Sequence, residues 1–252
     1  MTTPETPPSP DPFGFTTAGH ARLRVLGPVS EEAVGRWAER VAAKHPIGDA
    51  HLIDVGCGKG EWAVQVLARL AGDGVGVEPN PSFAHAALTR AEERLGPGRF
   101  TVENCHWEDA AAVHDRFTIA VCTGSLQAFG RLDTALKGLG ERLTPGGLAL
   151  LGTPYWRIPP DTAFLANLGA RADDHTSLED TLAEVRALGW EVLASEAASS
   201  EARQRVTVNR IIRDAEDLVD RVHEVVAQLL EAIDRECRRH RVCDRLNERR
   251  LL

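Results

Sequence analysis

The sequence predicts a doubly wound α/β domain, with a mostly parallel, Rossmann-like sheet, helices on both faces, an N-terminal helical lid and a long C-terminal helix. Three observations predict the sheet. Short β-rich runs alternate with amphipathic stretches, which is typical of a parallel sheet covered on both sides. A glycine-rich turn follows the first run, and a carboxylate stands at the end of each of the first two runs.

The elements follow from hydrophobic periodicity and from helix-start signals. Ser30 is a suitable N-cap, and Glu31 and Glu32 in the first turn favour the positive end of a helix dipole. Predicted strands cover residues 51–55, 74–77, 100–103, 117–122 and 148–152. Predicted helices cover residues 30–43, 62–70, 82–95, 132–143 and 178–188, and the last runs into the β-rich segment WEVLA (190–194).

The last fifty residues have a different pattern. Apolar residues between 211 and 233 form a wide helical stripe, which suits a helix packed on its own domain or a contact in a homodimer. The preceding segment RQRVTV (203–208) alternates like a strand, and its structure is ambiguous. We therefore divide the chain into a Pro-rich tail (1–12), a helical lid (13–48), a core domain (49–200) and a C-terminal helical extension (201–252).

Composition excludes several classes of protein. The 252 residues include 29 Lys and Arg against 37 Asp and Glu, a formal net charge of −8, which argues against a nucleic-acid partner. Neither a signal peptide nor a membrane-spanning run is expected. The cysteines are odd in number and lack CxxC spacing, which predicts free thiols in the cytoplasm and no metal site; they are Cys57, Cys105, Cys122, Cys237 and Cys243.

The sequence Asp-Val-Gly-Cys-Gly-Lys-Gly (54–60) ends the first predicted strand. Its alternate glycines allow close approach to a ligand and are expected to leave backbone N–H groups free at a helix start. The spacing differs from the G-x-G-x-x-G of dinucleotide sites. The carboxylate of Asp54, two residues before the first glycine, suits a ligand that bears an ammonium group and no phosphate.

Glu78 ends the second predicted strand, 22 residues after Gly56. An acidic residue at this place can accept hydrogen bonds from both ribose hydroxyls. Together with the glycine turn, Glu78 indicates a nucleoside that has a cationic tail without phosphates. S-adenosylmethionine is such a molecule.

Four segments, VGCGKGE (55–61), GVEPN (76–80), CTGSLQAFG (122–130) and LTPGGLALLGTPYW (143–156), resemble the class I S-adenosylmethionine-dependent methyltransferases, in particular bacterial small-molecule members. The segment LGPVSEE (26–32) is similar to a helical lead-in that some of them carry over the cofactor. The resemblance implies a cofactor site formed by Asp54, Gly56, Cys57, Gly58, Glu78, Pro79, Cys105, His106, Trp107, Cys122 and Gly124.

By that resemblance, each part of the cofactor has its own set of residues. The turn that begins at Asp54 would hold the methionine end, and Glu78 the ribose. Residues 105–107 would flank the adenine, and residues 122–124 would lie near the sulfonium. Many family members have Asp where this sequence has Cys105. Either Asn104, Glu108 or Asp109 would therefore bind the adenine instead, or the backbone and stacking alone would hold it.

The implied reaction is in-line methyl transfer to a small organic acceptor, with release of S-adenosylhomocysteine. Tyr155 and Trp156 follow the fifth predicted strand at the edge where such folds bind ligands, so both are candidate substrate-binding residues. Tyr155 and His20, which lies in the predicted lid, are the candidate catalytic residues. No carboxylate cluster for a metal and no [DN]-P-P-[YF] motif follows the fourth predicted strand.

Three other functions stay open. The chain would be a regulatory or partner protein if it bound the cofactor without consuming it. A nicotinamide oxidoreductase is disfavoured by the glycine spacing. An RNA methyltransferase would use the arginine-rich end RECRRHRVCDRLNERRLL (235–252), although cations in the last turns of a helix commonly complement its dipole.

Overall fold

The computed structural model describes residues 12–45 and 50–198. Residues 12–22 and residues 23–198 fall in separate compact units. The first unit contains, in its described part, helix α1 (Gly14–His20). The predictions for the Pro-rich tail up to residue 11, for the segment 203–208 and for the C-terminal helix with its arginine-rich end lie outside the described residues.

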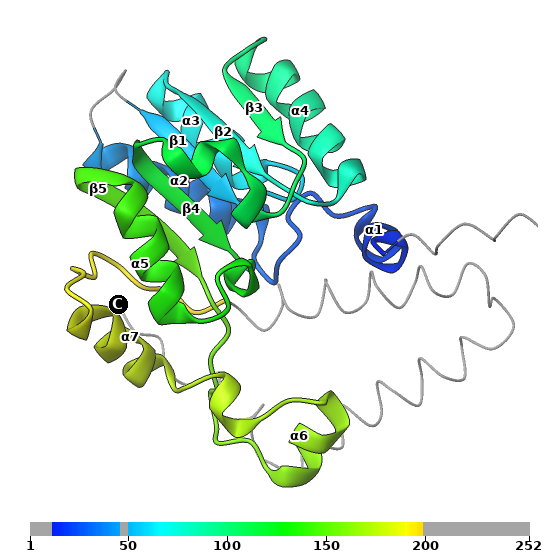
Figure 1. The fold of residues 1–252 in the computed structure, drawn as a ribbon, viewed down its shortest axis with the longest axis vertical. Helices are drawn as coiled ribbons and strands as arrows, with labels where there is room; N and C mark the ends of the chain where they lie inside the picture. Colours follow the sequence, from blue (N-terminus) through cyan, green and yellow to red (C-terminus); the bar gives the residue numbers. More distant parts are fainter. Residues whose placement is uncertain (1–11, 46–49, 199–252) are drawn as a thin grey trace, which may run out of the picture. The chain divides into compact units, whose positions relative to one another are not determined.

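Residues 23–198 are built around a sheet of five parallel strands in the order β3-β2-β1-β4-β5 (Figure 1). The strands are β1 (His51–Val55), β2 (Asp73–Val77), β3 (Phe100–Glu103), β4 (Phe117–Thr123) and β5 (Leu143–Gly152). The chain winds outward from β1 to β3, returns to β4 beside β1, and continues to β5. The switch in direction places the carboxyl ends of β1 and β4 side by side, where doubly wound folds bind their ligands. The predicted Rossmann-like sheet is therefore confirmed.

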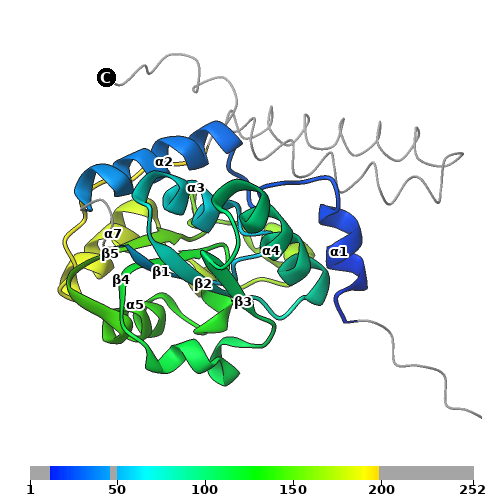
Figure 2. The same ribbon diagram turned by 90° about the horizontal axis from the view of Figure 1, so that it is seen from above.

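Helices cover both faces of the sheet, with α2 and α3 on one side and α5 on the other (Figure 2). The bounds are α2 (Glu31–Lys44), α3 (Glu61–Leu70), α4 (Pro81–Leu95), α5 (Leu132–Arg142), α6 (Thr162–Leu168) and α7 (Leu178–Ala187). Short 3-10 turns lie at Trp107–Asp109, Ala111–His114, Leu126–Ala128 and Ala172–Asp174.

Side-chain alternation along β1 explains the two layers. Leu52 packs in the cluster that contains α2, α3 and α4 residues, whereas Ile53 and Val55 pack in the cluster that contains Leu139 of α5. Successive strand residues point to opposite faces, so a strand buried on both faces must be apolar throughout. Asp54 is the exception, and it shares the face of Leu52.

The start of α2 agrees with the helix signals in the sequence. The Ser30 hydroxyl accepts a hydrogen bond from the Ala33 amide, and Glu31 and Glu32 occupy the first turn. Ala38 and Val41 of α2 are buried in the same core cluster as the α3 side chains. Part of the segment predicted as a lid thus belongs to the packed core.

Two expectations about the elements, the end of one helix and the strand-like segment 190–194, are wrong. Leu143, expected at the end of a helix, instead begins β5 and pairs with Phe117; a register shift follows where Gly146, at φ +78°, bends the strand. The segment 190–194 is not a strand. The chain there, after α7, forms neither helix nor strand, and the Glu196 carboxylate that follows is bound by Arg36 and Arg40 of α2 at 2.7 and 3.3 Å.

None of the helices in the described parts of the chain is both long enough and apolar enough to span a bilayer.

Candidate cofactor and active site

The glycine turn joins the carboxyl end of β1 to α3. Gly56, Gly58 and Gly60 all have positive φ, at +69°, +55° and +75°, and Gly60 is the N-cap residue of α3. This left-handed conformation is strained for other residues. A Cβ on Gly60 would also lie 3.0 Å from the Cβ of Ala87 on α4. The turn geometry therefore requires glycine at these three positions.

The amides of the turn are hydrogen-bonded within the protein. Those of Gly56 and Cys57 donate to the Val77 carbonyl at 2.8 and 3.1 Å, and that of Gly60 donates to the Cys57 carbonyl at 2.9 Å. The Gly58 amide donates to Glu78 Oε2 at 2.9 Å. The expectation of free amides is wrong at these four positions, because strand β2 accepts two of them, Glu78 directly after β2 accepts the third, and the turn itself accepts the fourth. A turn in which these four donors are already bonded does not suit a pyrophosphate.

Asp54 is buried beneath the turn, with 1% of its surface exposed. The Ala63 amide at the start of α3 donates to its carboxyl group, but Oδ2 has no hydrogen-bond partner among the described residues. Burial and the nearby charge of Glu78 raise the pKa of Asp54 to about 8. A cation at this carboxylate would stabilise its ionised form.

Glu78 lies directly after β2 and is 7% exposed. Its two oxygens accept from the Gly58 amide and the Asn80 amide, each at 2.9 Å. Burial raises the pKa of Glu78, while these two amides and His106 oppose the shift. A carboxylate has about four acceptor positions, so the group retains capacity for two further donors, as a ribose requires.

The segment after β3 is fixed to Glu78 and to its own strand. Asn104 donates from Nδ2 to the Glu78 carbonyl at 2.7 Å, and Glu103 accepts the amides of Ala111 and Ala112 at 2.5 and 2.9 Å. The Asn104 amide group, one candidate for binding the adenine, is thus used to position Glu78. Sequence reasoning missed the anchoring role of Glu103.

The aromatic candidate in this segment has a neighbour from the loop after β4. The Trp107 ring lies 5.2 Å from the ring of Phe129, centroid to centroid, and both pack on the α5 side of the core. His106 is exposed, and Cys105 and Pro79 are half-buried. The structure thus brings residues 104–107 to the edge of the sheet at Glu78.

The loop after β4 meets the glycine turn through Ser125, which the sequence analysis overlooked. The Ser125 hydroxyl donates to the Val55 carbonyl at 2.5 Å and lies 3.3 Å from Cys122 Sγ. A Cβ on Gly56 would lie 2.3 Å from the Ser125 Cβ. The sequence shows Gly56 in one motif and Ser125 in another, but it does not reveal that the two residues are in contact.

Two of the three cysteines assigned to the cofactor site, Cys57 and Cys122, have buried side chains. Cys57 packs in the core against Gly76, and Cys122 belongs to the α5-side cluster. Burial is the main cause that raises the pKa of both thiols, that of Cys122 to about 11. Gly124, at φ +75°, follows β4 and donates its amide to the Gly152 carbonyl. Only backbone atoms of Cys57 and Gly124 are therefore suited to contact a ligand.

The segment that precedes α2 covers the glycine turn. Lys59 Nζ donates to the Leu23 carbonyl at 2.9 Å. Leu26 places its Cδ1 only 2.6 Å from the position that a Cβ on Gly58 would take. Residues 23–26 therefore pack directly on the turn.

The candidate substrate-binding and catalytic residues belong to the segment after β5 and to α1. Tyr155 and Trp156 follow β5, and Trp156 packs within the next segment: its Nε1 donates to the Ala172 carbonyl at 3.0 Å, and its ring lies 5.2 Å from that of His175. His20 ends α1 in the other compact unit and donates from Nδ1 to the Thr16 carbonyl. The roles of these residues stay predictions.

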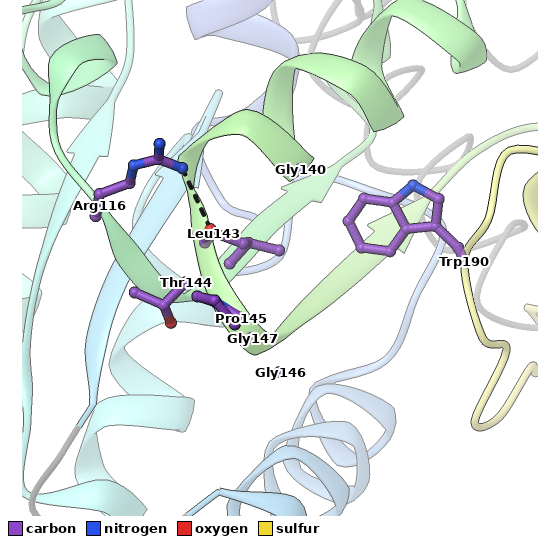
Figure 3. A pocket seen from close by; sticks show the side chains of 8 residues that line it. All are labelled: Arg116, Gly140, Leu143, Thr144, Pro145, Gly146, Gly147 and Trp190. Atoms are coloured by element: carbon purple, nitrogen blue, oxygen red, sulfur yellow. Dashed lines mark hydrogen bonds between the residues drawn. The ribbon is translucent and has the colours of Figure 1, made fainter.

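A pocket of about 490 Å³ lies at the opposite end of the sheet, between the starts of β4 and β5 (Figure 3). Arg116 and Trp190 line it together with the turn at Pro145–Gly147. The Arg116 guanidinium donates to the Glu141 carbonyl at 2.5 Å. This pocket lies away from the glycine turn and Glu78, so it has no part in the candidate active site.

Across residues 12–45 and 50–198, no group of three or more His, Cys, Asp or Glu side chains is arranged to hold a metal ion.

Comparison with known proteins decides the family. A family model described as "Methyltransferase domain" matches residues 29–198, about two thirds of the chain. The chain belongs to this methyltransferase family. The predicted resemblance to the class I S-adenosylmethionine-dependent methyltransferases is confirmed, and with it the enzyme class and the cofactor that define that class.

Two individual relatives are similar to this methyltransferase over more than half of its length. It is 27% identical over 144 residues to a ubiquinone biosynthesis O-methyltransferase of Azorhizobium caulinodans, covering 57% of this chain and 56% of the relative. It is 28% identical over 195 residues to the uncharacterized protein YjhP of Escherichia coli, covering 75% of each.

A solved structure is similar over a longer range. The S-adenosylmethionine-dependent methyltransferase of Geobacter sulfurreducens, in complex with S-adenosyl-L-homocysteine, matches with a TM-score of 0.73 and 25% identity. The match covers 88% of this chain and 90% of that one.

Proposed function

We propose that the protein transfers a methyl group from S-adenosylmethionine to a small organic acceptor, and that Asp54 and Glu78 hold the cofactor. One observation carries the assignment of the site: a glycine turn with internally bonded amides lies between two buried carboxylates. Such a site offers carboxylate acceptors, and four of its turn amides are already bonded, so it favours an ammonium group and ribose hydroxyls. A dinucleotide would require the reverse at its pyrophosphate.

Different residues would bind different parts of the cofactor. The unpartnered Oδ2 of Asp54 would receive the charge of the methionine end, and the remaining acceptor positions of Glu78 would receive the ribose hydroxyls. Trp107, with Phe129 behind it, would flank the adenine. The backbone at Gly124 would line the cofactor near the sulfonium.

When bound, the cofactor supplies an already activated methyl group. The main task of the protein is then to align the acceptor for in-line displacement and to exclude water. A general base adds about 10²–10⁴-fold only where the nucleophile carries a proton. We propose Tyr155 and Trp156 as acceptor-binding residues and Tyr155 and His20 as the candidate bases.

Calorimetric titration with S-adenosylmethionine, S-adenosylhomocysteine and NAD(P) tests the site. Micromolar binding of the first two, with no response to NAD(P), is expected. The cofactor site is assigned to Glu78 if Glu78→Ala loses this binding while Glu92→Ala, an exposed substitution on α4, keeps it. If neither sulfur compound binds, the proposed function is wrong.

Screening of acceptors by the release of S-adenosylhomocysteine then separates the enzyme from a binding protein. Production of S-adenosylhomocysteine with at least one small acceptor is expected. A chain that binds the cofactor but yields no product with any acceptor would instead be a regulatory or partner protein.

The compartment and the partners complete the proposal. A reducing, cytoplasmic location is supported by the free thiols of Cys57, Cys105 and Cys122. We propose that the partner of the site is the small acceptor. We also propose that the protein is a monomer, or a homodimer formed through the C-terminal helix. Size-exclusion chromatography with light scattering measures this oligomeric state.

A further inference from the structure

We propose that Lys59 is a positioning residue that fastens residues 23–26 over the glycine turn, so that this segment retains the bound cofactor. The inference rests on the proposed function, because it assumes that the turn at Gly56–Gly60 holds the methionine end. It assigns a role to the one charged side chain within the turn.

Lys59 is shaped for a contact across the turn. Its backbone lies between Gly58 and Gly60, and its side chain turns toward the N-terminal segment, where Nζ donates to the Leu23 carbonyl at 2.9 Å. The ammonium also lies 5.7 Å from the centroid of the Phe83 ring on α4, within the range of a cation–π contact. Arg90 of α4 binds the Lys59 carbonyl and fixes the other end of the residue.

Leu26 makes the second contact between the segment and the turn. Its Cδ1 occupies space that any side chain at position 58 would need, since a Cβ there would lie 2.6 Å away. Val25 beside it is buried, at 7% exposed. The segment thus makes an apolar contact with the turn at Gly58 and a hydrogen bond with it at Lys59.

The two contacts lie next to the proposed cofactor site, which is why we assign them a role in retaining the cofactor. Gly58 is also the residue whose amide is bound by Glu78, the proposed ribose acceptor. Residues 23–26 therefore pack on the stretch of turn that connects the two proposed ends of the cofactor site. A ligand seated there is released faster when the segment is loosely held, and changes in affinity within one site mostly arise from the dissociation rate.

The test measures release of the cofactor. Protein loaded with tritiated S-adenosylmethionine is chased with excess unlabelled S-adenosylhomocysteine, and the retained label is followed over time. Lys59→Met keeps the apolar stem and removes the donor, and is expected to release label about tenfold faster, as suits the loss of one charged hydrogen bond. Lys137→Met, at an exposed position of α5, is the matched control and should release at the wild-type rate.

Further readouts separate positioning from simple destabilisation. Lys59→Met is expected to keep the melting temperature of the free protein within a few degrees and to raise KM for the cofactor more than it lowers kcat, and Lys59→Arg should restore slow release. If Lys59→Met does not fold, Leu26→Ala replaces it, with the same expected result.

The outcomes are distinguishable from those of the proposed function. If the wild-type protein fails to retain any label, the proposed function fails and the inference falls with it. If the wild-type protein retains label while Lys59→Met and Leu26→Ala release it at the wild-type rate, the cofactor assignment stands and the fastening role of Lys59 is wrong.

Discussion

Replacing the buried Asp54 carboxyl with an amide should remove a large part of the pH dependence of folding. Asp54→Asn keeps the shape of the side chain and the oxygen that accepts from Ala63. In the unfolded chain the group has its ordinary pKa of 3.8, whereas in the folded protein its pKa is about 8. Between these values the folded protein holds a proton that the unfolded chain has lost.

The sign and size of the effect follow from proton linkage. Because the folded state binds more protons in this window, the free energy of unfolding falls as pH rises, by up to about 1.4 kcal/mol per pH unit. From pH 5.5 to pH 7.5 the loss at Asp54 is therefore up to about 3 kcal/mol. The loss is complete only above the folded pKa. Glu78, whose pKa is also raised, contributes a slope of the same sign.

Urea unfolding of the cofactor-free protein at pH 5.5, 6.5 and 7.5 measures this slope. Asp54→Asn is expected to flatten most of it and to be more stable than wild type at pH 7.5. Glu92→Gln, an exposed substitution on α4, should leave the slope unchanged. A slope in Asp54→Asn equal to that of wild type would refute the argument that the Asp54 proton is retained on folding.

Three other predictions concern the same site. At pH 7, cofactor binding should release up to one proton from Asp54, seen as a dependence of the binding enthalpy on the ionisation enthalpy of the buffer; Asp54→Asn should abolish this dependence. Glu78→Gln should weaken S-adenosylhomocysteine binding by at least about tenfold in calorimetry, because one charged acceptor is lost; an unchanged Kd would argue against the ribose role. Gly56→Ala should cost more than about 2 kcal/mol in urea unfolding, because a Cβ at positive φ would clash with Ser125. Ser125→Gly, which removes the clashing side chain, should recover part of that loss in the double variant, and complete additivity would contradict the contact.

Local sequence signals were sufficient for most of the sheet. The strand over 100–103 and the cap at Ser30 were predicted to the residue, because alternation and capping are properties of neighbouring residues. The segment 190–194 has the composition of a strand but none of the pairing. Its course is set by Glu196, which binds two arginines about 160 residues earlier in the sequence. Such a long-range contact leaves no local signal.

The site shows the same division. Asp54, Glu78 and the three glycines were found because their spacing is a local motif. Ser125 was missed because its importance comes from Gly56, 69 positions away in the sequence and within touching distance in the fold. The free amides were predicted wrongly for a related reason: three of the four donate to the Val77 carbonyl or the Glu78 carboxylate, which belong to the neighbouring strand and its end.

The hydrogen bond from Gly58 to Glu78 has a consequence for how this fold can change its ligand during evolution. The Glu78 carboxylate accepts the backbone N–H of Gly58 and also presents free acceptor positions beside it. A substitution at position 78 that removes the carboxylate therefore does two things at once: it takes away a ribose acceptor and uncovers a backbone donor. Loss of the Glu78 carboxylate alone would therefore shift this part of the site from an acceptor toward a donor, which favours an anionic ligand, with every glycine of the turn unchanged.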